Sequence, residues 1–395
     1  MALFKSYHVS MKLRDCHNIE DFRKLAQRRL PSPIFNFIDG GAEDEITLRR
    51  NTQSFDYCDL VPSVLAGMNS VDLSTTVLGQ KLNMPVILSP TAMQRLYHQD
   101  GEKAVARVAE KYGTMYCVST MSTTSLEEIA SSAGGPQLFQ LYMHKDKGLT
   151  RDLIARCKDA GYHALALTVD TVVSGNRERD YRSGMTTPPT LTLKSLISFA
   201  MHPGWTFGYF LGEKFILANV AKYIKQGSDI ASSVFDYINT QMDSVISWSD
   251  AEMVRKEWGG PFAIKGIMSA SDAMKAVDVG ASAIILSNHG GRQLDASRTP
   301  FEQLQEIVDK VGDRIEIIMD GGIKRGSHIL KALALGAHAC SGGRFYLYPL
   351  AAMGEAGVDR AMEIIRDELF RNMMLMGCKS LGDLDRSKIA LRFPA

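Results

Sequence analysis

The sequence predicts an α/β fold, the TIM (β/α)8 barrel, in which parallel strands close into a cylinder surrounded by helices. Three observations support this prediction. After about residue 83, short β-rich runs alternate with amphipathic helical patterns, which indicates parallel strands joined by crossover helices. There are eight β-rich runs, the number that closes a TIM barrel. Their polar and reactive residues stand at their carboxyl ends, where barrel enzymes carry their chemistry.

The predicted strands and helices follow one another in regular order. The strands span 84–90, 115–120, 137–142, 164–170, 262–267, 283–289, 316–322 and 338–344. Helical periodicity is found at 101–112, 125–132, 147–160, 271–279, 301–311 and 327–335. A doubly wound open sheet is the competing architecture. No GxGxxG pattern follows the first strand, so a dinucleotide site has little support.

Length and composition fit one large domain. The chain has 395 residues, of which 45% are hydrophobic, enough for a large core. We expect a single domain over residues 1–395, with the barrel at about 84–380. Residues 1–60 precede the barrel, and a final amphipathic helix is expected over 355–376.

Charge and cysteine usage narrow the class of partner. The formal net charge of +1 gives no global electrostatic reason to expect nucleic acid, and small metabolites fit better. The six cysteines form neither CxxC pairs nor a dense framework, which suits reduced thiols in the cytosol. We expect no metal site. The amino terminus lacks the long apolar region of a secretory signal, so we expect a cytoplasmic protein.

The connection after the fourth strand is anomalously long. It runs from Thr171 to about Trp248 and contains an insertion at about 184–247, where a βα loop usually has only a few residues. Residues 195–212 carry five aromatic side chains and no formally charged residue. Pro203 and the glycines that follow it argue against a continuous spanning helix.

Two interpretations of this insertion remain open. It forms either a lid or oligomer contact packed on the barrel, or an interfacial membrane segment over 195–225. In the second case the aromatic side chains lie in the headgroup region, with Lys214, Lys222 and Lys225 at the edge.

A base and a cation stand three residues apart in the segment 287–295, SNHGGRQLD. His289 and Arg292 follow an apolar run, and the two glycines between them allow a sharp turn. The imidazole and guanidinium can then converge on one small anion. Further polar residues end the other strands and would meet these two at one barrel mouth: Ser119, Thr120, Gln140, Tyr142, Thr168, Asp170, Lys265 and Asp320.

This nonamer resembles the signature of the FMN-dependent 2-hydroxy acid dehydrogenases and oxidases, the family of L-lactate dehydrogenase, mandelate dehydrogenase and glycolate oxidase. Residues 39–45, DGGAEDE, resemble the family's amino-terminal cap. Residues 175–180 and 202–205, at the insertion, are similar to mandelate dehydrogenase. The resemblance covers nearly the whole chain. It implies FMN-dependent oxidation of a lactate- or mandelate-like L-2-hydroxy acid to the 2-oxo acid, with electrons passed to a quinone or another carrier.

The FMN site is expected at two glycine-rich loops. Residues 320–326, DGGIKRG, and 341–344, SGGR, follow the seventh and eighth predicted strands, where barrels supply backbone donors and a cation to a phosphate. The resemblance implies cofactor contacts from Pro90, Thr91, Ala92, Ser119, Gln140, Thr168, Lys265, Ser287, Asp320, Gly321, Gly322, Lys324, Arg325, Gly343 and Arg344.

Oxidation of a 2-hydroxy acid requires a carboxylate clamp and a base. Guanidinium geometry suits the carboxylate, so Arg292 and Arg177 are the candidate clamp, and Tyr142 adds a hydroxyl. His289 is the candidate base. The resemblance pairs it with Asp170, which would orient the ring and stabilise the imidazolium. It also places Lys265 against the flavin, where a fixed cation favours the anionic reduced form.

Three positions depart from the family pattern. Phe37 stands where a tyrosine hydroxyl normally contacts the substrate carboxylate, so one hydrogen bond is missing. Lys324 replaces an arginine beside the flavin and loses the planar fork. Met121 replaces the tryptophan of glycolate oxidase and leaves a more adaptable wall.

Several alternatives and partners follow from these patterns. Residues 91–94, TAMQ, look like glycolate oxidase and keep an oxygen-using oxidase open. An FMN barrel isomerase would have little use for the anion clamp, and a non-enzymatic membrane protein would leave an intact site without a purpose. The resemblance also implies a homo-oligomer, with a tetramer as the common state, and a peripheral position on the inner face of the cell membrane.

Overall fold

The computed structural model describes residues 12–186, 190, 192–213, 215–223 and 241–392. Within them, eight parallel strands form a closed barrel in the order β10, β11, β4, β5, β6, β7, β8, β9. Their bounds are β4 Val86–Leu88, β5 Met115–Ser119, β6 Gln137–Tyr142, β7 Ala164–Thr168, β8 Phe262–Ile267, β9 Ala283–Leu286, β10 Glu316–Asp320 and β11 Ala339–Gly342. The predicted TIM barrel is therefore confirmed.

The strands form because their side chains are buried on both faces. β5, β7 and β9 consist entirely of buried residues, the continuous apolar pattern of a sheet covered by helices. Small and medium side chains such as Ala164, Ala263 and Ile318 fill the barrel interior. A hairpin of β2 (Thr75–Val77) and β3 (Gln80–Leu82) adds Leu78 and its neighbours to the same cluster. Since Leu78 N donates to Glu316 Oε2 at the start of β10, the hairpin closes the amino-terminal end of the barrel.

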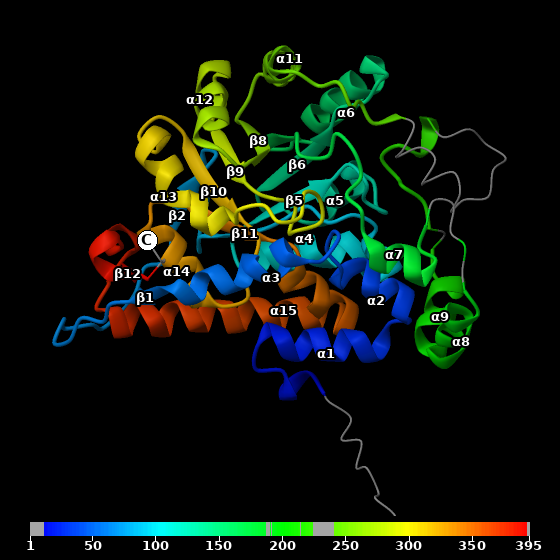
Figure 1. The fold of residues 1–395 in the computed structure, drawn as a ribbon, viewed down its shortest axis with the longest axis horizontal. Helices are drawn as coiled ribbons and strands as arrows, with labels where there is room; N and C mark the ends of the chain where they lie inside the picture. The colour runs from blue at the N-terminus through cyan, green and yellow to red at the C-terminus, as the bar shows by residue number, and fades with distance from the viewer. Residues whose placement is uncertain (1–11, 187–189, 191, 214, 224–240, 393–395) are drawn as a thin grey trace, which may run out of the picture.

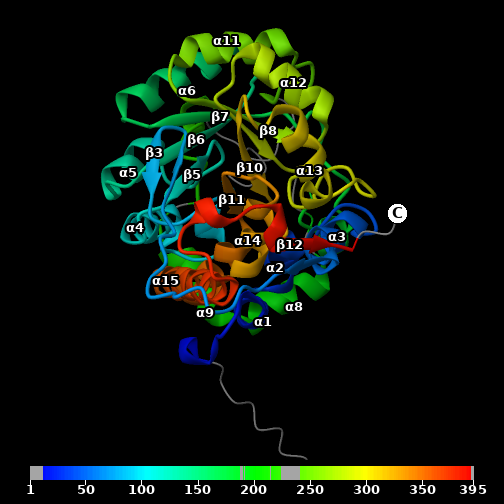
Figure 2. The same ribbon diagram turned by 90° about the vertical axis from the view of Figure 1, so that its left-hand side faces the viewer.

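Helices surround the barrel, as Figures 1 and 2 show. Their bounds are α4 Gly101–Lys111, α5 Leu126–Ser132, α6 Lys147–Asp159, α11 Trp248–Trp258, α12 Ala270–Val279, α13 Pro300–Val311, α14 Gly326–Ala334 and α15 Arg344–Met376. The six helices predicted between strands agree with these within one or two residues. Capping explains several of the starts, because Ser125 and Thr299 each accept from the backbone three residues on and pair with a glutamate there.

Two helices differ from the prediction. α15 begins at Arg344, directly after the eighth strand, and is kinked at Met353 and Gly354. The pattern at 355–376 therefore corresponds only to its second part. α11 occupies the interval before the fifth strand and was not anticipated as a helix.

An amino-terminal cap covers the carboxyl ends of the strands. It consists of α1 (Ile19–Arg29), α2 (Ser32–Asp39) and α3 (Ile46–Gln53), and α1 lies beside α15 (Figure 1). β1 (Cys58–Leu60) pairs antiparallel with β12 (Ile389–Leu391), so the segment that follows the cap lies beside the carboxyl-terminal strand.

The insertion after β7 contains α7 (Glu178–Ser183), α8 (Leu193–Met201) and α9 (Pro203–Leu211). The helices α8 and α9 are separated at His202 and Pro203, in agreement with the break predicted there. Among the described residues, no helix has the length and apolarity needed to cross a membrane. Lys214 and Lys225, expected at the edge of the aromatic segment, lie outside the described residues.

Candidate active site

A cavity of about 1060 Å³ lies at the carboxyl ends of the barrel strands, beneath the amino-terminal cap. It brings together most of the residues predicted for the site. Those that line it are Phe37, Pro90, Thr91, Ala92, Ser119, Tyr142, Arg177, Lys265, His289, Arg292, Asp320, Gly321, Gly322, Lys324, Gly343 and Arg344. Gln140, Thr168, Asp170, Ser287 and Arg325 are not part of the lining.

His289 and Asp170 form a pair at the cavity wall. The His289 Nδ1 donates to Asp170 Oδ1 at 3.0 Å, which leaves Nε2 as the basic nitrogen. Burial alone would raise the pKa of Asp170, but His289 and Lys265 hold it below its ordinary value. The second oxygen, Oδ2, is buried and has no hydrogen-bond partner among the described residues. The carboxylate is thus kept charged next to a ring that can accept a proton.

Backbone conformation places this pair beyond the strand ends. β7 ends at Thr168 and β9 at Leu286, so Asp170 and His289 stand in loops and not in the longer predicted strands. His289 itself adopts a left-handed φ of 58°. Gly266 has a φ of 107°, and a Cβ there would approach Asp170 Cβ to 2.7 Å. A side chain at residue 266 would displace the carboxylate.

Two guanidinium groups flank the Phe37 ring. The Cζ atoms of Arg292 and Arg177 lie 5.3 and 5.4 Å from its centroid. Arg292 Nη1 donates to the carbonyls of Phe37 and Gly40, at 2.8 and 2.9 Å, and Arg177 lies 3.3 Å from Asp180. Burial, together with Arg177 and Arg344, lowers the pKa of Arg292 to about 9. An anion in this part of the cavity would offset the cost of holding these charges together.

Lys265 is held by a buried polar network. Its Nζ donates to Ser287 Oγ at 3.0 Å and lies 3.7 Å from Asp320 Oδ2. The Asp320 carboxylate accepts hydroxyl hydrogen bonds from Ser89, Ser287 and Ser341 at 2.5, 2.7 and 2.8 Å. Ser287 and Asp320 therefore position the ammonium group. A further chain of buried hydrogen bonds joins the neighbouring strands, because Gln140 donates to Thr168 and accepts from Ser119.

Glycines of both glycine-rich loops line the cavity. Gly322 has a φ of 73°, and a Cβ there would lie 1.9 Å from the Asn51 carbonyl oxygen. A Cβ on Gly343 would approach Thr91 to 2.9 Å. α14 and α15 begin directly after these loops, and the positive end of a helix dipole favours an anion there. The side chain of Lys324 also lines the cavity, with Nζ 3.8 Å from Glu20.

The two arginines of these loops are placed differently. Arg344 lines the cavity and donates to the carbonyls of Ile38, Gly40 and Gly290. Arg325 instead pairs with Glu368 on α15 at 2.7 Å, outside the lining. The expected contact of Arg325 with a phosphate therefore has no support in this geometry, because its guanidinium is held by α15.

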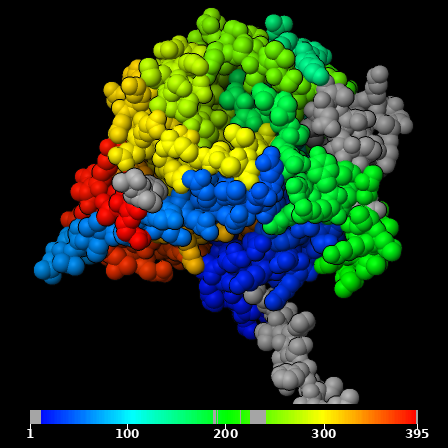
Figure 3. All heavy atoms as spheres, in the orientation of Figure 1, coloured from blue at the N-terminus to red at the C-terminus, as the bar shows by residue number. Residues whose placement is uncertain are grey.

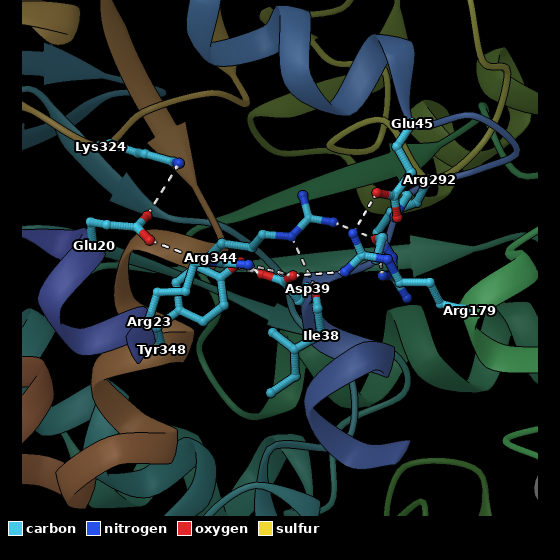
Figure 4. Close-up of polar contacts among 12 residues, drawn as sticks. Glu20, Arg23, Ile38, Asp39, Glu45, Arg179, Arg292, Lys324, Arg344 and Tyr348 are labelled. Carbon is cyan, nitrogen blue, oxygen red and sulfur yellow. Dashed lines mark hydrogen bonds and ion pairs between the residues drawn. The ribbon is translucent and has the colours of Figure 1, made fainter. Parts of the chain in front are cut away.

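A charged network over the cavity was not anticipated. Asp39 accepts from Arg23 Nε at 2.6 Å, from Arg179 at 2.8 Å and from the Tyr348 hydroxyl at 2.8 Å. Figure 4 shows Asp39 between Arg23 and Arg179, with Arg179 reaching Glu45. Although burial opposes it, Arg23 lowers the pKa of Asp39 to about 2. The network joins α1, α2, α7 and α15, and the sequence signal for it was only the acidic segment 39–45.

Two residues of the nonamer have roles that the sequence did not reveal. Gln293 Nε2 donates to the carbonyls of Asp170 and Val173, which holds the loop carrying the acid against the loop carrying the base. Asp295 accepts from the backbone of Ile46 and Thr47 and caps α3. The sequence offered only one signal for these roles, which is that Gln293 and Asp295 follow His289 closely.

Comparison with known proteins gives consistent results over the whole chain. A family model described as FMN-dependent dehydrogenase matches residues 26–391. Glycolate oxidase 1 of Oryza sativa subsp. indica is 39% identical over 372 residues, 94% of this chain and 95% of that protein. L-Lactate dehydrogenase of Caulobacter sp. (strain K31) is 38% identical over 371 residues, 94% and 97% of the two chains. The crystal structure of the monotopic membrane protein (S)-mandelate dehydrogenase has a TM-score of 0.91 at 34% identity, covering 95% of this chain and 100% of that chain.

Proposed function

Because the chain belongs to the FMN-dependent dehydrogenase family, we propose that it oxidises a lactate- or mandelate-like L-2-hydroxy acid to the 2-oxo acid and passes the electrons to a quinone or another carrier. Family membership makes it an FMN-dependent 2-hydroxy acid oxidoreductase, which sets aside the isomerase and non-enzymatic alternatives. The observation that carries the finer proposal is one cavity lined by His289, Arg177 and Arg292, with Asp170 hydrogen-bonded to His289 from outside the lining.

The cavity fits the family's cofactor. The glycines at 321–322 and 342–343 line the cavity with backbone alone, because a Cβ at 322, 342 or 343 would clash with Asn51, Phe345 or Thr91, and Lys324 and Arg344 add cations to the lining. Lys265 lies deeper, in a network that keeps it in place. When bound, FMN supplies the two-electron acceptor for the oxidation.

In this proposal each step on the substrate is assigned to a residue of the site. Arg292 and Arg177 bind the carboxylate, and burial raises the pKa of Tyr142, so its hydroxyl remains a protonated donor. His289 Nε2 takes a proton from the substrate. Asp170 then stabilises the imidazolium through the bond to Nδ1.

We predict one FMN per chain, with the phosphate held by Lys324 and not by Arg325. Replacement Lys324→Met should weaken FMN binding by about ten- to a hundredfold, because a charge-assisted contact is lost. Equilibrium dialysis of released FMN gives the dissociation constant. Arg325→Met is the matched control and should leave that constant unchanged, since Arg325 pairs with Glu368 outside the lining. If both variants bind FMN more weakly by the same factor, Arg325 contacts the cofactor as the sequence predicted.

The helices α8 and α9 support a membrane-surface role. Phe207, Phe210 and Leu211 are 65, 76 and 84% exposed on α9. The opposite face is anchored, because Trp205 Nε1 donates to the Leu96 carbonyl at 2.9 Å. Figures 1 and 3 show these helices projecting at one edge of the molecule. The similarity to (S)-mandelate dehydrogenase, which is described as a monotopic membrane protein, supports the same assignment. We propose a cytoplasmic enzyme attached to the inner membrane face, assembled as a homo-oligomer.

Vesicle binding tests this attachment. The full chain should sediment with vesicles of anionic phospholipid, and Phe207→Ser with Phe210→Ser should reduce the bound fraction several-fold by removing inserted apolar area. The control is Val64→Ser with Leu65→Ser, which removes two exposed apolar side chains outside the insertion. Unchanged binding by the α9 variant, with a changed oligomeric state, would favour an oligomer contact instead.

An oxidase using molecular oxygen is the second candidate, favoured by the 39% identity with glycolate oxidase 1. The enzyme is first reduced anaerobically with L-lactate or (S)-mandelate. It is then mixed with either oxygen or a short-chain ubiquinone, and flavin reoxidation is followed by absorbance. We expect the quinone to reoxidise it faster; faster reoxidation by oxygen would select the oxidase.

A further inference from the structure

The carboxylate clamp lacks a hydroxyl at residue 37. Phe37 is buried between Arg177 and Arg292, and its ring offers no hydrogen-bond donor. The family pattern has a tyrosine there. A clamp built for a carboxylate with one donor fewer would bind its substrate more weakly, unless another residue supplies the bond.

Tyr97 is placed to supply it. The residue follows the short 3-10 helix Gln94–Leu96, lines the same cavity and is only 4% exposed. Within the described part of the chain, no hydrogen bond to its hydroxyl is found. Among the described residues, the hydroxyl oxygen is not one of the fully buried polar atoms without a partner, so it opens onto the cavity, where a ligand can complete its hydrogen bonding.

The charges around Tyr97 belong to the clamp. Burial raises the pKa of Tyr97 above its ordinary value, and the charges that act on it include Arg292, Asp180 and Arg177. The hydroxyl therefore remains protonated and can donate to an anion held by the two arginines.

The Tyr97 segment is also held firmly. Gln94 N donates to Glu102 Oε1, and Met93 N donates to the Met121 carbonyl on the neighbouring loop. The Leu96 carbonyl accepts from Trp205 of α9. A hydroxyl on so constrained a backbone is a positioned donor, and little entropy is lost when it binds.

We propose that Tyr97 is a substrate-binding residue whose hydroxyl donates to the substrate carboxylate, in place of the hydroxyl absent at Phe37. This inference rests on the proposed function and adds a residue to its clamp. The hydroxyl acts on binding equally before and during the reaction, whereas the base acts only on the proton being transferred.

The first test is Tyr97→Phe in the FMN-loaded enzyme, measured by anaerobic flavin reduction with L-lactate. The apparent dissociation constant should rise about tenfold or more, while the limiting rate changes less than about threefold. Binding of oxalate, measured by calorimetry, should weaken by a similar factor. Because oxalate has no α-hydrogen, this second readout needs no turnover.

The second test is rescue. Phe37→Tyr in the Tyr97→Phe background should recover most of the lost affinity, because one hydroxyl replaces the other at the same anion. Tyr181→Phe, a hydroxyl deletion at an exposed residue of α7, is the control and should change neither constant.

Four results separate the possible failures. Unchanged affinity in Tyr97→Phe, or a loss that Phe37→Tyr does not recover, overturns the proposal for Tyr97. Equal losses of affinity and limiting rate in Tyr97→Phe would also overturn the proposal, because they indicate that the substitution displaced the surrounding backbone and did not simply remove a binding contact. If no 2-hydroxy acid reduces the wild-type flavin, the proposed function fails, and oxalate binding still decides the role of Tyr97.

Discussion

His289→Gln should slow anaerobic reduction of the bound flavin by at least about a hundredfold at saturating 2-hydroxy acid, the lower range for loss of a positioned general base. Glutamine can keep the donor bond to Asp170 but accepts no proton. The 3.0 Å contact and the lowered pKa of Asp170 show that the wild-type ring is oriented by a charged partner. Stopped-flow absorbance of the flavin measures the rate directly.

Substrate affinity should remain nearly unchanged in this variant, because the carboxylate is proposed to bind to Arg177, Arg292 and Tyr142. Oxalate binding and FMN content are therefore the internal controls, and His17→Gln is the surface control. A His289→Gln enzyme that reduces its flavin at the wild-type rate would contradict the proposed role of the base.

Arg292→Met should raise the dissociation constant for oxalate by about thirtyfold to several thousandfold, the range for truncating one partner of a buried charge pair. The wild-type guanidinium is half-buried near Arg177, and desolvation together with the neighbouring arginines lowers its pKa. A bound carboxylate offsets this effect. The dissociation constant of Arg292→Lys for oxalate should lie between those of the wild type and Arg292→Met, because lysine keeps the charge but loses the planar fork.

The matched control for this series is Arg182→Met, which removes a guanidinium from an exposed position on α7. Calorimetry with the FMN-loaded proteins gives the constants. If Arg292→Met binds oxalate as tightly as the control, the carboxylate does not lie at the Arg292 guanidinium. Arg177 would then be the remaining candidate for the clamp.

The candidate pair His289 and Arg292 was predictable because the signal is local. The apolar run at 283–286 requires burial on both faces, and the glycines after it allow the turn. The same reasoning located the glycine loops at 321–322 and 342–343. Relationships between distant segments were less accessible: the pairing of Asp170 with His289 came from family resemblance, and only the structure shows its 3.0 Å geometry.

Other features required the folded chain. Arg325 and Lys324 are adjacent in sequence, yet one is held by Glu368 and the other lines the cavity. Nothing in the local pattern distinguishes them, because the difference depends on where α15 passes. The Asp39 network likewise joins four helices, and its low pKa arises from partners far along the chain.

By itself, the sequence determined the barrel, its strand order and the end of the barrel that carries the chemistry. Those properties follow from apolar periodicity and short-range turn chemistry, which each segment contains alone. Tertiary structure decided which charges are buried together and which hydroxyls face them. Phe37 and Tyr97 are the clearest example. Both line the same cavity, and Phe37 has no hydroxyl to donate whereas Tyr97 has one. Desolvation and hydrogen-bond geometry depend on neighbours that only folding brings together.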